Sequence, residues 1–124
     1  MYFEDIKFVT LYNGNSGPTK PMQKVIHNSD DLALSFGNNN PPKLDFANEE
    51  AVIVALGEKP TNGFSVEITA ITYITDRGEN LPGLLSVTYV VKSAKQTSDV
   101  ITRPLHVVKL KKLEGDVEFN VQNG

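Results

Sequence analysis

The segment that most constrains the fold is the apolar run of residues 51–56, which reads AVIVAL. Six successive apolar residues, half of them β-branched, suit a short strand that is buried on both faces. Such a strand needs apolar material above and below it, so it belongs in the middle of a sheet system. We therefore expect residues 51–56 to lie at the centre of the fold.

Other segments alternate apolar with polar residues, which is the pattern of strands with one buried face. These segments lie at 6–12, 65–75, 84–92, 105–110 and 117–121, with a short extended piece at 23–26. In the second segment we expect Val66, Ile68, Ala70 and Ile74 to share the buried face, because even steps along a strand return to the same side. The turn-forming residues at 76–83 predict a hairpin between the second and third segments.

A single short helix is predicted from residue 29. Ser29 can cap its first turn by accepting hydrogen bonds from free backbone N–H groups. Asp30 and Asp31 then suit the positive end of the helix dipole. An apolar stripe follows, and residues 37–42, which read GNNNPP, are expected to end the helix at once.

These elements predict a mainly β protein with about seven short strands and one short α-helix, arranged as a β-sandwich or a partly open barrel. The strands follow one another too closely for helical crossovers between parallel neighbours. The sequence has no internal repeat and no linker-like stretch. Residues 1–124 are therefore expected to form a single domain.

Composition argues against several classes of function. The net charge of −3 provides no basic surface for nucleic acid or for an anionic membrane. No apolar stretch approaches the ~20 residues of a membrane span. Cysteine is absent, which excludes disulfides, thiol nucleophiles and cysteine-ligated metals. Residues 2–5, YFED, do not begin a secretory signal, so an exported form would have lost its leader from this sequence.

The residues that could support catalysis have simpler structural explanations. His27 precedes the helix and is expected to be exposed, whereas His106 is in phase with core residues and is expected to be a structural histidine. Neither has a second ligand at metal-binding spacing. The acidic pairs at 30–31 and 49–50 are assigned to the helix dipole and to a solvated strand entry. We therefore predict no enzymatic activity, no metal and no cofactor.

The densest group of turn-forming residues lies at 57–64, which reads GEKPTNGF. Pro60 fixes one backbone angle, Gly63 permits a left-handed conformation, and the Thr and Asn between them can close the turn through side-chain hydrogen bonds. Phe64 stands at the exit of the turn. Two interpretations stay open: a tight connection between core strands with Phe64 buried, or a rigid loop that presents Phe64 to a partner.

A longer motif surrounds this turn. Residues 52–68, VIVALGEKPTNGFSVEI, resemble the core motif of the PrcB C-terminal-like family, and the segments at 25–26, 44–46, 102–111 and 117–119 fit further parts of its pattern in order. Leu105 departs from the pattern, which has an aromatic after the proline, and Asn62 stands where the family often has Gly. The family is named for an accessory subunit of a bacterial surface protease complex. The resemblance thus implies an exported, extracytoplasmic protein that assists or stabilises a protease.

A second resemblance competes with the first. Residues 59–64 and the dipeptide at 103–104 are similar to two loops of the chagasin-type cysteine-protease inhibitors, immunoglobulin-like sandwiches that block an active-site cleft with three loops. The tryptophan that follows these motifs in the inhibitors is missing, since the chain contains none. The third loop is represented at best by residues 81–83.

The sequence therefore predicts a non-catalytic protein-binding module, an accessory or stabilising domain for an envelope or secreted bacterial protease. Its binding site is expected at Lys59, Pro60, Thr61, Asn62, Gly63, Phe64, Arg103 and Pro104. The alternatives are a chagasin-like inhibitor and a carbohydrate-binding sandwich. The latter is disfavoured because exposed aromatic platforms are expected to be scarce, with four tyrosines and no tryptophan. The identity of the partner and the oligomeric state stay open.

Overall fold

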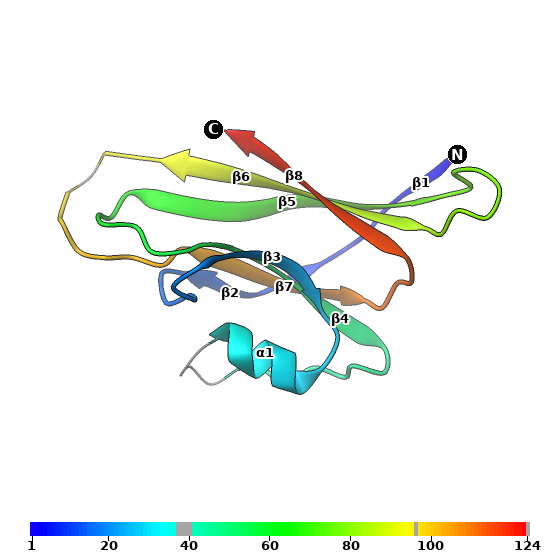
Figure 1. Ribbon diagram of the computed structural model, residues 1–124, viewed down its shortest axis with the longest axis horizontal. Coiled ribbons are helices and arrows are strands. Elements are labelled where there is room, and N and C mark those ends of the chain that lie inside the picture. The colour runs from blue at the N-terminus through cyan, green and yellow to red at the C-terminus, as the bar shows by residue number, and fades with distance from the viewer. Residues whose placement is uncertain (37–40, 96, 124) are drawn as a thin grey trace.

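The apolar run at 51–56 forms the centre of the fold, as the sequence predicts. In a computed structural model that describes residues 1–36, 41–95 and 97–123, the run belongs to strand β4 (Glu49–Leu56). Strands β3 (Pro21–Ile26) and β7 (Leu105–Lys111) pair with β4 on either side, and β2 (Val9–Gly14) pairs with β7. These strands form an antiparallel sheet of order β2-β7-β4-β3, here called the lower sheet from its place in Figure 1.

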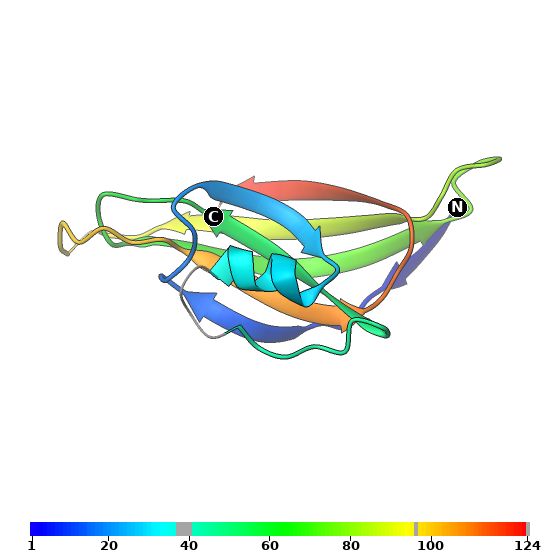
Figure 2. The ribbon, with the colours of Figure 1, turned by 60° about the horizontal axis from the view of Figure 1, so that its bottom comes forward.

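The other strands form the upper sheet, of order β1-β5-β6-β8. Their bounds are β1 (Tyr2–Asp5), β5 (Phe64–Thr75), β6 (Leu84–Ser93) and β8 (Asp116–Asn123). β5 and β6 make the predicted hairpin across residues 76–83, and β8 returns parallel to β6. The two sheets stack in layers, and the helix α1 (Ser29–Phe36) covers the lower sheet from below (Figures 1 and 2). The prediction of a mainly β sandwich with one short helix is confirmed, with eight described strands rather than about seven.

Both faces of β4 are buried, and each faces a different core. Val52 and Val54 point between the two sheets, where they pack with residues of β5, β6 and β7. Ala51, Ile53 and Ala55 point the other way, onto the apolar face of α1. Full burial of one aliphatic side chain contributes about 1.5 to 3 kcal/mol, so this strand links the two largest sources of stability in the fold.

The predicted buried face of β5 is only half correct, because the strand contains a bulge. Val66 and Ile68 are buried as predicted, but the pairing with β6 shifts register between Ile68 and Ala70. One extra residue reverses the alternation that follows it. Ala70 is therefore exposed, and Ile71 enters the core in its place. Ile74 lies on the same outward face of β5 as Ala70 and is half-buried.

The first strand was predicted at 6–12, but only residues 9–12 of that range are strand, and they belong to β2. The chain leaves β1 after Asp5, crosses with Ile6 buried between the layers, and enters β2 at Val9. β1 is a four-residue strand without an alternating burial pattern, so the sequence carried no periodic signal for it.

The helix begins where the sequence predicts, but its cap is Asn28 rather than Ser29. The Asn28 Oδ1 accepts a 2.8 Å hydrogen bond from the backbone N–H of Asp31. Asparagine and serine are comparable N-caps, which is why residue type alone could not decide between neighbours. The predicted helix stop at 37–42 begins in residues 37–40, which lie outside the described residues.

Candidate functional site

Two loops meet at one end of the sandwich, at the left in Figure 1. The first, residues 57–64, connects β4 to β5, and the second, residues 97–104, leads into β7. Lys59 and Thr102 join them through two backbone hydrogen bonds of 2.8 and 2.9 Å, which form an antiparallel bridge. We call these two loops together the tip. The structure thus brings together the two sequence segments that the predicted site contained.

Asn62 ties the second loop of the tip to the first. Its Oδ1 accepts hydrogen bonds from the backbone N–H groups of Thr97 and Ser98, at 2.8 and 3.1 Å, and its Nδ2 donates to the Thr97 hydroxyl at 2.6 Å. The sequence predicted that Asn62 closes its own turn, and this was wrong: these side-chain partners lie 35 and 36 residues away. A single amide thereby fixes a loop that has few other described contacts.

Arg103 holds the base of the tip. Its guanidinium contacts one carboxylate oxygen of Glu58, with Nη2 at 3.0 Å and Nε at 3.2 Å. Its backbone N–H donates to the carbonyl of Asn15, and its own carbonyl accepts from the N–H of Gly17. Arg103 therefore links both loops of the tip to the turn between β2 and β3, and its charged group is already engaged within the chain.

Two glycines shape the first loop. Gly57 has a φ of 78°, and a Cβ atom at that position would lie 2.8 Å from the ring of Pro21. Gly63 has a φ of 100°, which confirms the predicted left-handed position. Both positions are unfavourable for other residues, so the path of residues 57–64 is set by backbone geometry as well as by hydrogen bonds.

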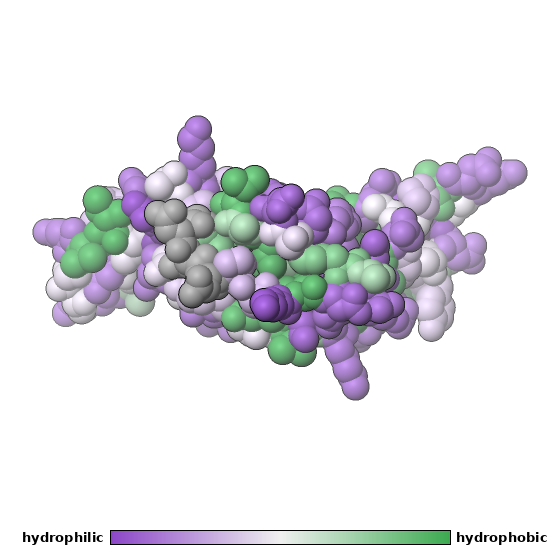
Figure 3. Space-filling model, turned by 90° about the horizontal axis from the view of Figure 1, so that it is seen from below, coloured by the Kyte–Doolittle hydropathy of each residue, from purple (hydrophilic) through white to green (hydrophobic). Residues whose placement is uncertain are grey.

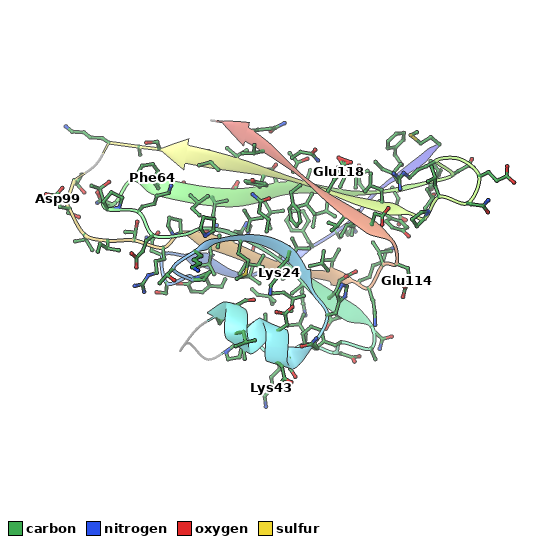
Figure 4. All side chains as sticks on the ribbon, viewed as in Figure 1. Lys24, Lys43, Phe64, Asp99, Glu114 and Glu118 are labelled. Atoms are coloured by element: carbon green, nitrogen blue, oxygen red, sulfur yellow. The ribbon has the colours of Figure 1, made fainter. Side chains whose placement is uncertain are left out.

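Phe64 is half-buried at the start of β5. It is therefore neither fully buried in the core nor fully exposed to a partner, the two alternatives that the sequence left open. The ammonium group of Lys59 lies 5.3 Å from the centre of its ring, a cation–π distance. Figure 4 shows Phe64 and Asp99 at the same end of the molecule, on the two loops of the tip. Part of the aromatic ring therefore remains accessible at the tip.

The most exposed apolar residues of the tip are Val100 and Ile101, with 61% and 60% of their surfaces accessible. Pro60 of the first loop is exposed as well, and Figure 3 shows apolar surface at this end of the molecule. Val100 and Ile101 were not among the predicted site residues, although two adjacent β-branched side chains in a polar stretch without strand periodicity were a usable signal. Pro104, by contrast, is fully buried, so in this structure its side chain packs inside the domain.

The loop at 81–83 lies far from the tip. In the β5–β6 hairpin Phe64 pairs with Ser93 at the tip end, whereas Ile74 pairs with Leu84 at the other end. Phe64 and Ile74 are ten residues apart along β5, so the two ends of the hairpin are separated by roughly 30 Å. Two of the three loops that the inhibitor resemblance invoked are therefore adjacent, but the third is at the opposite end of the sandwich.

Exposed aromatic residues do not form a platform in the described part of the chain. Tyr2 and Phe3 are the aromatic side chains with large exposed surfaces. They are successive residues of β1, so they point to opposite faces of the sheet. A sugar ring stacks on a broad aromatic face, and this arrangement offers no shared one.

Glu50 was expected in a solvated strand entry, and this was wrong. Only 1% of its surface is accessible, because it is in phase with the buried Val52. One carboxylate oxygen accepts from the backbone N–H of Leu113 at 2.7 Å, and the other lies 3.5 Å from Nδ1 of the exposed His27. Burial raises the pKa of the Glu50 carboxyl, which the hydrogen bond from Leu113 only partly offsets.

The remaining candidate groups do not converge on a reaction centre. His106 is buried, and both of its ring nitrogens have hydrogen-bond partners. Across residues 1–36, 41–95 and 97–123 there is no group of three or more His, Cys, Asp or Glu side chains placed to hold a metal ion. In the same residues, no helix is both long enough and apolar enough to cross a membrane.

Together these features define a small, helix-covered β-sandwich domain with a loop cluster fixed at one end. Residues 51–111 match the family described as PrcB C-terminal. The match confirms the resemblance read from residues 52–68 and includes the whole tip. The further likenesses at 25–26, 44–46 and 117–119 fall outside it. No curated protein sequence and no solved structure gives a match.

Proposed function

We propose that the tip is a protein-binding site, and that the chain acts without catalysis as an accessory or stabilising domain for a protease. The observation that carries this proposal is the combination of a fixed backbone at the tip with the exposed apolar pair Val100 and Ile101. The PrcB C-terminal family, named for a protease accessory subunit, supports a protease as the partner.

The fixed backbone favours binding because the loops of the tip lose little conformational entropy when a partner binds. Binding normally costs about 0.5 to 1.5 kcal/mol for each flexible side chain that becomes immobilised, and ordering a loop costs more. At the tip, Asn62 and the Lys59–Thr102 bridge already hold both loops in one arrangement. A partner would therefore meet a surface whose shape exists before contact.

The exposed pair supplies the driving force for association. Covering a valine or isoleucine side chain contributes about 1.5 to 3 kcal/mol when burial is complete. The first loop adds the exposed Pro60 and the cation–π pair of Lys59 and Phe64 to the same tip. Exposed apolar side chains together with an aromatic ring and a cation are typical of protein interfaces.

A role without catalysis is supported by the surroundings of the three titratable groups whose pKa values are shifted, because each of them is buried. Burial raises the pKa of the Tyr89 hydroxyl, which accepts a hydrogen bond from Gln23. Burial also lowers the pKa of His106, whose ring nitrogens are both engaged. Glu50 faces a pocket of only about 50 Å³. Each of these groups is used within the fold, so none is offered as a reacting group.

We also propose that the protein works outside the cytoplasm, in the envelope or the secreted space of a bacterium. The family name supports this location, because the complex it refers to acts at the cell surface. Fractionation of host cells that produce the natural full-length protein would test it. The proposal requires the protein in the envelope or the medium, and recovery in the cytoplasmic fraction alone would contradict it.

Photo-crosslinking tests the binding proposal directly. A photoreactive amino acid replaces Val100 in one version of the protein and the exposed Leu81 of the opposite loop in another. After illumination in the host envelope fraction, we expect position 100 to yield a crosslink to a protease that position 81 does not yield. The protease must then bind the purified chain. Equal crosslinking from both positions, or binding that survives Val100→Asp with Ile101→Asp, would overturn the proposal.

A further inference from the structure

The edges of the two sheets are unequally protected against pairing with another strand. β1 has only four residues, β2 is interrupted by a register shift between Thr10 and Tyr12, and β3 begins at Pro21 and carries Lys24. Short length, irregularity, proline and charged side chains, lysine above all, keep edge strands from pairing. Of these, β8 has only the carboxylates of Asp116 and Glu118: it is eight residues long, contains no proline or lysine, and pairs with β6 in unbroken register.

β8 also keeps an apolar row that the fold does not fully cover. Val117, Phe119 and Val121 lie on one face of the strand, and Phe119 packs against the core between the sheets. Val117 and Val121 remain 41% and 54% accessible. The opposite face is polar, and Glu118 and Asn120 both form hydrogen bonds with the hydroxyl of Ser86 in β6. Figure 4 shows Glu118 on β8. The edge therefore presents two chemically distinct rows to an approaching strand.

The sequence of β8 is symmetrical in chemistry about Phe119. Reading outward from that residue, Glu118 and Asn120 are the first polar pair, Val117 and Val121 are the apolar pair, and Asp116 and Gln122 are the second polar pair. An antiparallel pair of identical strands places each residue opposite its mirror position in the other copy. A two-fold axis at Phe119 thus sets apolar residues against apolar residues along the whole row.

We propose that two copies of the chain pair through β8, antiparallel and centred on Phe119, and join their upper sheets into one continuous sheet. In this register Val117 faces the partner subunit's Val121, and Glu118 faces the partner subunit's Asn120. No carboxylate stands directly opposite another carboxylate. The shared apolar strip between the two copies covers the valines that each copy leaves exposed.

The neighbouring registers are less favourable, which makes the proposal specific. An axis at Glu118 sets that carboxylate directly against the partner subunit's Glu118, and like charges opposite each other disfavour pairing. An axis at Asn120 moves Val117 out of register with the apolar residues of the partner subunit's β8, so one apolar pair is lost. A foreign strand gains nothing from symmetry in β8, whereas in self-pairing the symmetry matches like chemistry at every position. The observed symmetry therefore favours a second copy as the occupant.

Residues 1–124 contain no cysteine, so a disulfide test of this register has no background from native thiols. Single variants Glu118→Cys and Asn120→Cys are prepared, and both positions are exposed in the isolated chain. In the proposed pair, residue 118 faces residue 120 with Cα atoms about 5 Å apart, within disulfide range. The same residue in the two copies is offset by roughly 7 Å along the strand, which places two identical cysteines out of range.

Mild oxidation of an equimolar mixture of the two variants should therefore give a mixed disulfide dimer at least tenfold faster than either variant alone. A mass label on one variant identifies the mixed product. Equal rates in all three samples would overturn the proposed register, and so would the lack of any disulfide dimer in the mixture at millimolar protein.

Sedimentation of the protein without cysteines gives an independent measurement. We expect its mean mass to rise with concentration, and Val121→Lys to shift this rise to at least tenfold higher concentration while circular dichroism stays unchanged. A chain that stays monomeric throughout contradicts the proposal, even if an extended peptide from another protein is found to bind β8. Dimers that are insensitive to Val121→Lys also contradict it. The tip is not involved, so neither result bears on the proposed protease binding.

Discussion

His106 of β7 joins the two sheets through a hydrogen bond of 2.8 Å, in which its Nδ1 accepts from the backbone N–H of Ile68 in β5. Its other ring nitrogen lies 2.8 Å from the hydroxyl of Thr10 in β2. Because Nδ1 accepts, the neutral ring carries its proton on Nε2, which donates to Thr10. Ile68 and Thr10 each adjoin a register irregularity in their strands. One buried imidazole thus holds both irregular strands in place.

This arrangement predicts a loss of stability in mild acid. Burial lowers the pKa of His106 in the folded protein below its ordinary value of 6.5, so the unfolded chain takes up the proton first. The unfolded state then binds more protons than the folded state as the pH falls below about 6.5, and this group's contribution to the free energy of unfolding falls by up to about 1.4 kcal/mol for each pH unit.

The variant His106→Leu isolates that contribution. We expect it to lower the free energy of unfolding at pH 7.5 by about 1 to 3 kcal/mol, because the N–H of Ile68 loses its acceptor. Denaturant unfolding between pH 5 and 7.5 should show a weaker acid dependence in the variant than in the natural protein. If the two profiles are parallel, the buried neutral imidazole is not what makes the fold acid-sensitive.

Glu50 is expected to have the opposite effect to His106: its contribution to the free energy of unfolding falls as the pH rises. Its pKa is raised in the folded state, so its contribution to stability is present below the ordinary value of 4.5 and is lost as the pH rises through the folded pKa. Glu50→Gln keeps an oxygen acceptor for Leu113 and removes the buried charge. Thermal unfolding should therefore show the variant gaining stability relative to the natural protein at pH 8, with a smaller gain at pH 4.

Glu50→Ala serves as the contrasting variant. It leaves the N–H of Leu113 without an acceptor and is expected to cost about 1 to 3 kcal/mol. A Gln variant that is as unstable as the Ala variant at pH 8 would contradict the idea that charge burial, rather than loss of the hydrogen bond, dominates at this position.

Asn62→Ala should loosen the tip while the sandwich stays folded. The backbone N–H groups of Thr97 and Ser98 lose their acceptor, and their amide hydrogen exchange is expected to become at least tenfold faster. The melting temperature should fall by only a few degrees, since net hydrogen bonds are worth about 0.5 to 1.5 kcal/mol each. The exposed Glu79→Ala in the opposite loop is the control. Unchanged exchange at residues 97 and 98 would mean that other contacts fix the second loop.

The sequence could predict the parts of the fold that follow from local pattern. The run at 51–56 is apolar on both faces, and such a strand has few places to lie except between two apolar layers. The hairpin of β5 and β6 follows from two alternating segments that flank a turn. The bulge after Ile68 was not predictable from alternation. The N–H of Ile68 donates to His106, which lies 38 residues away in the sequence, and a local pattern carries no information about so distant a partner.

The candidate site was predictable in its first loop and not in its second. Residues 57–64 carry their own turn chemistry, so they are visible without a structure. Val100 and Ile101 become part of the site only because Lys59 and Thr102 pair across the tip. Glu50 was misjudged for a related reason. An acidic pair at a strand entry is usually solvated, but Glu50 is in phase with the buried Val52, and its hydrogen-bond donor Leu113 lies 63 residues away.

The proposed binding of a protease at the tip is tested most directly by the affinity of the purified chain for the protease that crosslinks to position 100. Val100→Asp should raise the Kd at least tenfold, since the loss of about 1.5 kcal/mol or more of burial corresponds to that factor. Leu81→Asp, at the opposite end, should leave the Kd within twofold. An unchanged Kd for Val100→Asp, or an equal loss for both variants, would contradict the claim.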